Sequence, residues 1–519
     1  MRVSHFSSAR LIVVWLMVGA VFSSGQAAQT SDAEALASLR ARADRGAADA
    51  QLALGKIYRD GKQAPQDFKE AAVWFRKAAD EGNAEAQVGL GALYQTGKGV
   101  PKDAGEAASW YRKAADQGNS HAQYNLGLLY TYGEGVKTDY NEAAVWYRKA
   151  ADQGLGSAER MLGVLYHDGL GVKQDLSEWA RWFLQAGNHG DVEAQFMLGR
   201  MSYYGQGVPK SLKESASWWR KASDQGDARA QGELGLMYRD GEGMPVDLGE
   251  AALLFRKAAD QGNASGQDNL GKMYFDGKGV PQDYGEAVRW LRKAADQGDA
   301  SAQLSLGSIY ENGAKDVPQD FNESVRWYRK VADQGIADAQ RRLGKMYLAG
   351  RGVPQDSAEA ASWFRKAADQ GDVRAQVLLG MRYENGDGVA KNYDEGTRLY
   401  RKAAEQGDAE GEFMLGLMYA LGEGVPRSYE EGAKWKKMAA DQGLPLAQQE
   451  VGVMYSLWGQ GVPHDVVQAY MWMTLASHGM NIGKSRDELA AKMTPEQIAE
   501  GERLAVQWKP SARFARGIE

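Results

Sequence analysis

Apolar residues recur at helical spacing along most of the chain, and the pattern itself repeats every 36 residues. Within residues 264–299, Leu270 and Tyr274 lie four positions apart on one predicted helix face. A Gly-Lys-Gly break follows, and a second apolar stripe centred on Trp290 predicts a second helix. The Leu-Gly pair of the first helix, once Val-Gly, begins at positions 54, 90, 126, 162, 198, 234, 270, 306, 343, 379, 415 and 451. The pattern therefore predicts a helix pair repeated twelve times.

Polar residues mark where these helices begin. Asp283 is followed three residues later by Glu286, which is the signature of a capping box, and every repeat carries an equivalent pair. Asn263 precedes a first helix and is a predicted N-cap. Its equivalents are Asn83, Asn119, Asp191, Asp227, Asp299, Asp372 and Asp408. Ten of the fifteen tryptophans share the position of Trp290, and a ladder of that regularity indicates core packing rather than a ligand or redox site.

A fixed period of this length is typical of an all-α solenoid, in which each unit packs on its neighbours around one continuous core. We place the twelve repeats at residues 48–480. The ends read differently, as the ends of a solenoid should. Residues 28–47 predict an N-terminal capping helix, and residues 481–519 predict a C-terminal capping helix and tail. The C-terminal helix begins at a capping box, Thr494 to Gln497, with Pro495 at its first position.

Residues 1–27 do not fit the repeat pattern. Arg2 and Arg10 precede an apolar run of twelve residues, Leu11 to Phe22. Gly25-Gln26-Ala27 then offers small residues at the two positions that a signal peptidase reads. We interpret this segment as a secretory signal peptide; a retained anchor is the alternative. The run is short for a membrane span. No later stretch is apolar enough to cross a bilayer, so we expect no span after signal removal.

Composition and charge exclude several classes of function. The formal net charge of −6 becomes −8 once the two signal-peptide arginines are removed, which argues against nucleic acid as a general partner. The chain has no cysteine, so disulfides and thiol chemistry are absent. The histidines are scattered without metal-ligand spacing, and no nucleophile or phosphate-binding motif occurs. We expect no enzyme activity, no cofactor and no metal.

Three segments depart from the repeat. In repeat four, Trp179 stands where other repeats have Ala, Leu184-Gln185 replaces Arg-Lys, and His189 replaces Gln. The change indicates either local repacking or a bend or partner contact. Repeat eight carries an extra residue in its loop at 313–317. Repeat twelve does so near Trp458, for which burial against the cap and exposure as an aromatic anchor are both open.

The units resemble Sel1-like repeats, which are relatives of the tetratricopeptide helical hairpins. The residues that carry the resemblance read Ala-x-x-x-Leu-Gly-x-x-Tyr-x-x-Gly-x-Gly-Val-Pro-x-Asp, then Ala-x-x-Trp, then Lys-Ala-Ala-x-x-Gly. The resemblance implies a right-handed superhelix of antiparallel helix pairs that serves as a protein-binding scaffold. It defines no catalytic residues. Exported bacterial members of the family are associated with envelope regulation, polysaccharide systems and contact with host proteins.

The variable positions of the first helix are the candidate binding residues. Three of them, at i, i+4 and i+7, share one face, which by analogy with tetratricopeptide hairpins lines the concave groove. Aromatic and arginine residues, the composition of interface hot spots, gather there in repeats three to seven. The alternative is that some of them only pack between repeats. The candidates are Tyr124, Arg160, His167, Phe196, Arg200, Tyr203, Arg239, Lys272 and Phe275.

The Arg-Lys pair near the end of each second helix, such as Arg76-Lys77, suits the negative end of the helix dipole. A basic stripe for an anionic ligand is the alternative, which the interleaved acidic residues disfavour. The sequence thus predicts an exported, non-enzymatic scaffold that binds a protein partner in the periplasm, in envelope regulation or assembly. A surface-exposed or secreted protein that binds a host protein is the alternative. The partner and the oligomeric state are not specified by the sequence.

Overall fold

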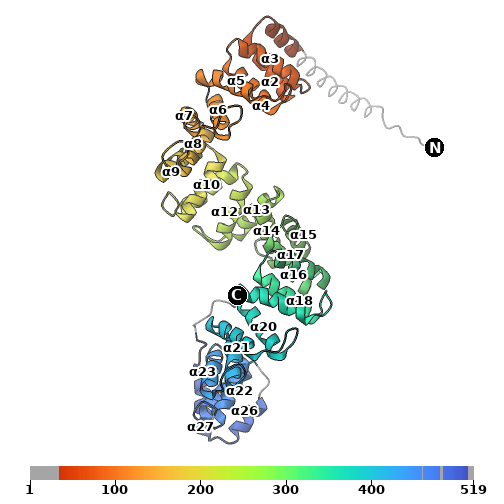
Figure 1. The fold of residues 1–519 in the computed structure, drawn as a ribbon, viewed down its shortest axis with the longest axis vertical. Coiled ribbons are helices and arrows are strands. Elements are labelled where there is room, and N and C mark those ends of the chain that lie inside the picture. The colour runs from red at the N-terminus through yellow and green to blue at the C-terminus, as the bar shows by residue number, and fades with distance from the viewer. Residues whose placement is uncertain (1–33, 459, 480–482, 512–519) are drawn as a thin grey trace, which may run out of the picture. The chain divides into compact units, whose positions relative to one another are not determined.

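The computed structural model describes residues 34–458, 460–479 and 483–511. The predicted signal peptide, residues 1–27, lies outside the described residues. The chain divides into two compact units, Met1–Gln261 and Gly262–Glu519, and each is described by itself. Figure 1 shows that both units consist of successive helices. Within each repeat the two helices pack against each other as a pair.

A helix over residues 34–44 opens the first unit. The helix pairs of this unit are α2 (Ala48–Asp60) and α3 (Phe68–Asp80), α4 (Ala84–Thr96) and α5 (Ala104–Asp116), α6 (Ser120–Tyr132) and α7 (Tyr140–Ala151), α8 (Gly156–Asp168) and α9 (Leu176–Asn188), α10 (Val192–Tyr204) and α11 (Leu212–Asp224), α12 (Ala228–Asp240) and α13 (Leu248–Asp260).

The second unit continues the same alternation and ends in two further helices. Its pairs are α14 (Ala264–Asp276) and α15 (Tyr284–Asp296), α16 (Ala300–Asn312) and α17 (Phe321–Asp333), α18 (Ala337–Ala349) and α19 (Ser357–Asp369), α20 (Val373–Asn385) and α21 (Tyr393–Glu405), α22 (Ala409–Leu421) and α23 (Tyr429–Asp441), α24 (Pro445–Ser456) and α25 (Val466–Ser477). The last two are α26 (Gly483–Ala490) and α27 (Pro495–Gln507). The all-α solenoid prediction is confirmed.

The predicted helix starts are confirmed, with one correction to the capping boxes. The Asp103 side chain accepts the Glu106 backbone N–H at 2.9 Å, and all the second helices of the repeats have such a cap. The Glu106 carboxylate does not complete the box. It accepts the indole N–H of Trp110 at 3.2 Å, one turn further along the helix. The same bond recurs at Trp146, Trp182, Trp290 and Trp363. In these five repeats the Glu therefore positions the tryptophan side chain.

The tryptophan ladder lies in the core, as predicted. Most of its members are buried, while Trp218 and Trp435 are half-buried. The Gly of each Leu-Gly pair is explained by the same packing. A Cβ built at Gly91 would lie 2.8 Å from the Tyr111 ring, so any side chain would push the two helices of the pair apart.

Two kinds of side-chain hydrogen bond join the helices beyond their apolar contacts. The Arg148 guanidinium donates to the Tyr166 hydroxyl of the next repeat at 2.5 Å, and equivalent Arg–Tyr bonds form along both units. Within a repeat, the Gln117 amide donates to the buried Gln87 side chain at 2.8 Å. This Gln–Gln bond also recurs. A polar group buried in this way needs a partner, and the repeat supplies one.

Helices outside the twelve repeats pack against the first and the last repeat. Residues 34–44 place Leu36, Leu39 and Ala43 against the first repeat. At the other end, α27 packs on α25 and begins with a complete capping box between Thr494 and Gln497. Trp508, just beyond that helix, packs against the Trp472 ring at 6.2 Å.

The structure decides some of the alternatives that the sequence left open for the irregular segments, while the bend at repeat four stays a prediction. Trp179 is 7% exposed and packs edge-on against Phe183, so it repacks the core locally and offers no partner contact. Trp458 is 81% exposed and stacks on His464 at 4.7 Å, so burial against the cap is wrong for this residue. The extra loop residue of repeat eight is absorbed in a tight turn, with Asp316 in the left-handed region at φ 63°.

Candidate binding surface on the first-helix face

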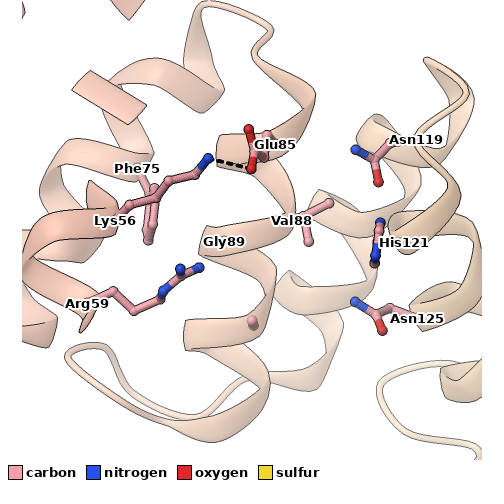
Figure 2. A pocket seen from close by; sticks show the side chains of 10 residues that line it. Lys56, Arg59, Phe75, Glu85, Val88, Gly89, Asn119, His121 and Asn125 are labelled. Atoms are coloured by element: carbon pink, nitrogen blue, oxygen red, sulfur yellow. Dashed lines mark ion pairs between the residues drawn. The ribbon is translucent and has the colours of Figure 1, made fainter. Parts of the chain in front are cut away.

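An open pocket of about 490 Å³ lies on the face formed by the first helices α2, α4 and α6. Lys56 and Arg59 come from α2, one turn apart. Figure 2 shows them on one side, with Asn119, His121 and Asn125 on the opposite side. Lys56 and Arg59 occupy the i+4 and i+7 positions of the variable face, and Val88 and Ala92 in the pocket floor occupy the i and i+4 positions of the next repeat. The variable positions of repeats one and two therefore line part of a pocket.

The cationic wall of this pocket is held by ion pairs that remain exposed to solvent. Lys56 Nζ lies 2.5 Å from Glu85 Oε1 across the gap between α2 and α4. Arg59 forms a two-point contact with Asp60, with Nε 2.7 Å and Nη2 3.2 Å from the carboxylate oxygens. That arginine lowers the pKa of Asp60 through the hydrogen bond. Both basic side chains keep access to the pocket.

The opposite wall belongs to the start of α6. Asn119 is its N-cap, and the Asn119 Oδ1 accepts the Ala122 N–H at 2.9 Å. His121, in the first turn of the helix, is exposed, and Asn125, in the second turn, is half-buried. These three residues were not candidates from the sequence. Asn125 directly follows Tyr124, and the two residues occupy both variable positions of the repeated frame Gln-x-x-Leu-Gly. A search for polar residues at both of these positions would have found Asn125.

Two of the sequence candidates, Tyr124 and Arg160, lie in one internal network. Arg160 Nε donates to Asp191 Oδ1 at 3.0 Å, and Asp191 is itself the N-cap of α10. Burial raises the pKa of Tyr124, which the neighbouring Arg160 opposes. The charge of Arg160 is thus used to join repeats four and five. His167 is exposed, contacts Asp168 at 2.6 Å and packs on the ring of Trp179.

The expectation that Phe196 is available on this face is wrong. Phe196 is 7% exposed and belongs to the core cluster of repeats five and six. The guanidinium of Arg229, from the next first helix, covers its ring at 4.2 Å and is itself held by Glu193 and Asp227. The first variable position is therefore a packing position here, which was the alternative left open for these sites.

Arg200 and Tyr203 lie on the same helix and differ in their surroundings. Arg200 is exposed. Burial raises the pKa of Glu233, and the positive charge of Arg200 opposes this rise. Tyr203 is half-buried, packs on Trp219 at 5.6 Å and donates to Glu242 at 2.6 Å. That hydrogen bond raises the pKa of Tyr203 to about 12. The three residues Phe196, Arg200 and Tyr203 therefore do not present one common contact surface.

The remaining candidates lie at the end of the first unit and in the second. Arg239 contacts Asp240 at 2.7 Å. Lys272 Nζ lies 2.7 Å from Asp268 Oδ2 and 2.6 Å from Ser301 Oγ. Burial raises the pKa of Asp268, and Lys272 opposes this shift. Phe275 lines a smaller pocket of about 250 Å³ with Lys272 and Ile309, again on a first-helix face.

The Arg-Lys pairs of the second helices place basic residues in the last helical turn, as predicted for the helix dipole, and their side chains make further contacts. Arg76 donates to Tyr94 of the next repeat, and Lys77 Nζ lies 4.0 Å from the centre of the Trp74 ring. The same Lys–Trp contact occurs at Lys113, Lys149, Lys221, Lys293, Lys330 and Lys366. These cation–π contacts and hydrogen bonds commit the pair to packing between and within repeats.

Among the residues that the structure describes, no three His, Asp or Glu side chains gather closely enough to hold a metal ion. In the same residues no helix has the length and apolar character needed to cross a membrane.

Comparison with known protein families identifies the type of repeat. The Sel1 repeat family model matches twelve consecutive segments: 48–83, 84–119, 120–155, 156–191, 192–227, 228–263, 264–299, 300–336, 337–372, 373–408, 409–444 and 445–479. The chain belongs to the Sel1 repeat family. Sel1 repeat proteins are non-catalytic helical scaffolds that generally mediate protein–protein interaction. The resemblance drawn from the motif is confirmed.

Solved structures include similar Sel1 repeat proteins from bacteria. A protective antigen present in uropathogenic Escherichia coli strains, displaying an SLR fold, is 37% identical, with 84% of this chain and 94% of that chain covered and a TM-score of 0.77. A Sel1 repeat protein from Oxalobacter formigenes is 29% identical, with 48% of this chain and 96% of that chain covered and a TM-score of 0.41. A search of curated proteins finds no match.

Proposed function

We propose that this Sel1 repeat protein is an exported scaffold that binds a protein partner on its first-helix face. The observation that carries the proposal is the open pocket between α2, α4 and α6, to which three successive repeats contribute side chains. The repeated basic and aromatic groups of the second helices are committed to packing instead. Binding by occupancy of a groove requires no catalytic group.

The predicted signal peptide supports export, and the bacterial relatives support a bacterial envelope as the setting. We propose the periplasm as the location and regulation or assembly of the envelope as the role. The likeness to a protective antigen supports a second candidate, a surface-exposed or secreted protein that binds a host protein.

Site-directed photocrosslinking in living cells tests where the partner binds. A photoreactive amino acid at His121, exposed in the pocket, should capture a partner protein, identified by mass spectrometry. The matched control is Val73, which is half exposed on the second helix α3. Capture from position 73 and none from position 121 would move the binding surface to the second-helix face.

Export is tested separately on the same cells. N-terminal sequencing of the mature protein should start near Ala28, and a product that starts at Met1 contradicts export. Protease added to intact cells distinguishes the two locations. Resistance in intact cells with digestion after outer-membrane permeabilisation supports the periplasm, and digestion in intact cells supports the surface.

A further inference from the structure

The pocket of α2, α4 and α6 presents mainly hydrogen-bond donors. Lys56 and Arg59 provide permanent positive charge on one wall. On the other wall, the oxygen of Asn119 is occupied by the Ala122 N–H, so this side chain offers its two amide N–H groups to the pocket. Glu85 is the single carboxylate among the lining residues. The set of groups complements a negatively charged ligand.

The pairs that hold the basic residues leave them able to exchange partners. The Lys56 and Glu85 side chains are 38% and 57% exposed, and an ion pair in that setting contributes little to stability because water screens it. A ligand carboxylate near Lys56 would compete with Glu85 rather than face an unpaired buried charge. Arg59 uses Nε and Nη2 for Asp60, which leaves the N–H groups of Nη1 for a ligand.

The floor and the volume of the pocket suit a peptide better than an isolated ion. Figure 2 shows Val88 and Gly89 between the two polar walls, and Ala92 also lines the pocket. A Cβ at Gly89 would lie 3.1 Å from the Phe75 ring, so the glycine keeps this floor low and closely packed. A volume of about 490 Å³ lies within the range of about 300–1,000 Å³ that is usual for ligand pockets, and is larger than a single ion needs. Asn125, with both donor and acceptor, fits the pairing needs of a peptide backbone.

We propose that this pocket binds an acidic linear segment of the partner protein, with an Asp or Glu carboxylate beside Lys56 and Arg59 on one wall and another acceptor group of the segment facing the Asn119 amide on the opposite wall. The proposal rests on the proposed function, and it specifies the chemistry of the partner. The backbone of the segment lies over Val88 and Gly89, within reach of Asn125. Because the attraction is between exposed charges, the affinity falls as salt concentration rises.

The test uses a random linear peptide library displayed on phage, selected on the chain from residue 28 onward. Selected peptides should be enriched in Asp and Glu. Affinities of individual peptides are then measured by fluorescence anisotropy. Lys56→Ala and Arg59→Ala should each weaken binding about fivefold, and Glu85→Gln, which removes the competing carboxylate, should strengthen it about threefold. The matched control is Lys69→Ala with Lys102→Ala, which removes two exposed charges of the same repeats outside the pocket.

Each outcome bears on the proposal. Loss of affinity in the pocket variants, a gain in Glu85→Gln and no change in the control support it. Selection of neutral or basic peptides, failure to select any peptide, or equal affinity for wild type and the pocket variants overturns it. If photocrosslinking at His121 captures a partner while the pocket variants bind the captured partner normally, the scaffold function stands and only the acidic-segment proposal fails.

Discussion

Repeats two and three differ from repeat four at positions that the fold makes equivalent. Ala107 in repeat two is fully buried, whereas its equivalent in repeat four, Trp179, carries a large ring in the same position and is also buried. The Arg–Tyr bond that joins regular repeats is absent between repeats four and five, where Leu184 and Ser202 occupy the two positions. Both members of the pair have changed together.

The two residues of the Gln–Gln hydrogen bond are also both replaced in repeat four. In repeat four the buried position carries Glu159, which is 2% exposed as a side chain, and its partner is His189 with Nδ1 2.8 Å away. A buried carboxylate needs a donor, and the histidine supplies it where glutamine does so elsewhere. Residues that contact each other in the regular repeats therefore change together in repeat four. Trp179 of the second helix α9 fills core space beside Phe183 in repeat four.

The largest expected effect comes from removing the ring that distinguishes repeat four. Trp179→Ala should lower the free energy of unfolding by about 3–5 kcal/mol, because a buried indole packed on Phe183 leaves a cavity. Urea denaturation followed by circular dichroism measures it, and hydrogen exchange should place the loss in repeats four and five. Trp458→Ala, at a largely exposed position, is the control and should change stability by less than about 0.5 kcal/mol. Equal effects in both variants would contradict the packing assigned to Trp179.

The next effect separates packing from binding on the first-helix face of α10. Phe196→Ala should cost about 2–4 kcal/mol, because the ring is buried beneath Arg229. Arg200→Ala, at an exposed position on the same helix, should change stability by no more than about 0.5 kcal/mol. Thermal unfolding of the two variants makes the comparison. A Phe196→Ala variant as stable as wild type would return this residue to the list of candidate contact residues.

A smaller effect is expected at the regular junction between repeats. Arg112→Met removes the bond to Tyr130 and the cation–π contact with Trp146, at 5.6 Å, and should cost about 1 kcal/mol. Leu184→Met, at the equivalent position of repeat four, should be nearly neutral because no such bond exists there. Urea midpoints of both variants provide the test. If both substitutions are neutral, the Arg–Tyr bond contributes nothing and the apolar ladder alone joins the repeats.

The smallest effect on stability is expected in the pocket itself. Lys56→Ala with Arg59→Ala should change the free energy of unfolding by less than about 0.5 kcal/mol, because both ion pairs are exposed. The same double variant should lose partner capture in a pull-down from envelope extract. The pairing of unchanged stability with lost capture identifies a binding surface. A large loss of stability would show that these residues hold α2 and α4 together instead.

The sequence by itself determined the period, the helix starts and the core ladder, because each of these depends on residues close together in the chain. Asp103 caps a helix that begins at the next residue. Gly91 lies opposite the ring of Tyr111, and most repeats place an aromatic ring at the same offset from the equivalent Gly. Local geometry and a repeated offset are both visible in a single sequence.

Only the tertiary structure decided which variable residues are available to a partner. Phe196 is buried because Arg229, 33 positions later, covers it, and Arg160 is used because Asp191 lies beside it. The pocket forms where small residues of one repeat lie between polar residues of its two neighbours, as Val88 does between Lys56 and Asn125. Exposure depends on the side chains that neighbouring repeats place over a residue, and that information is spread across three repeats rather than contained in one.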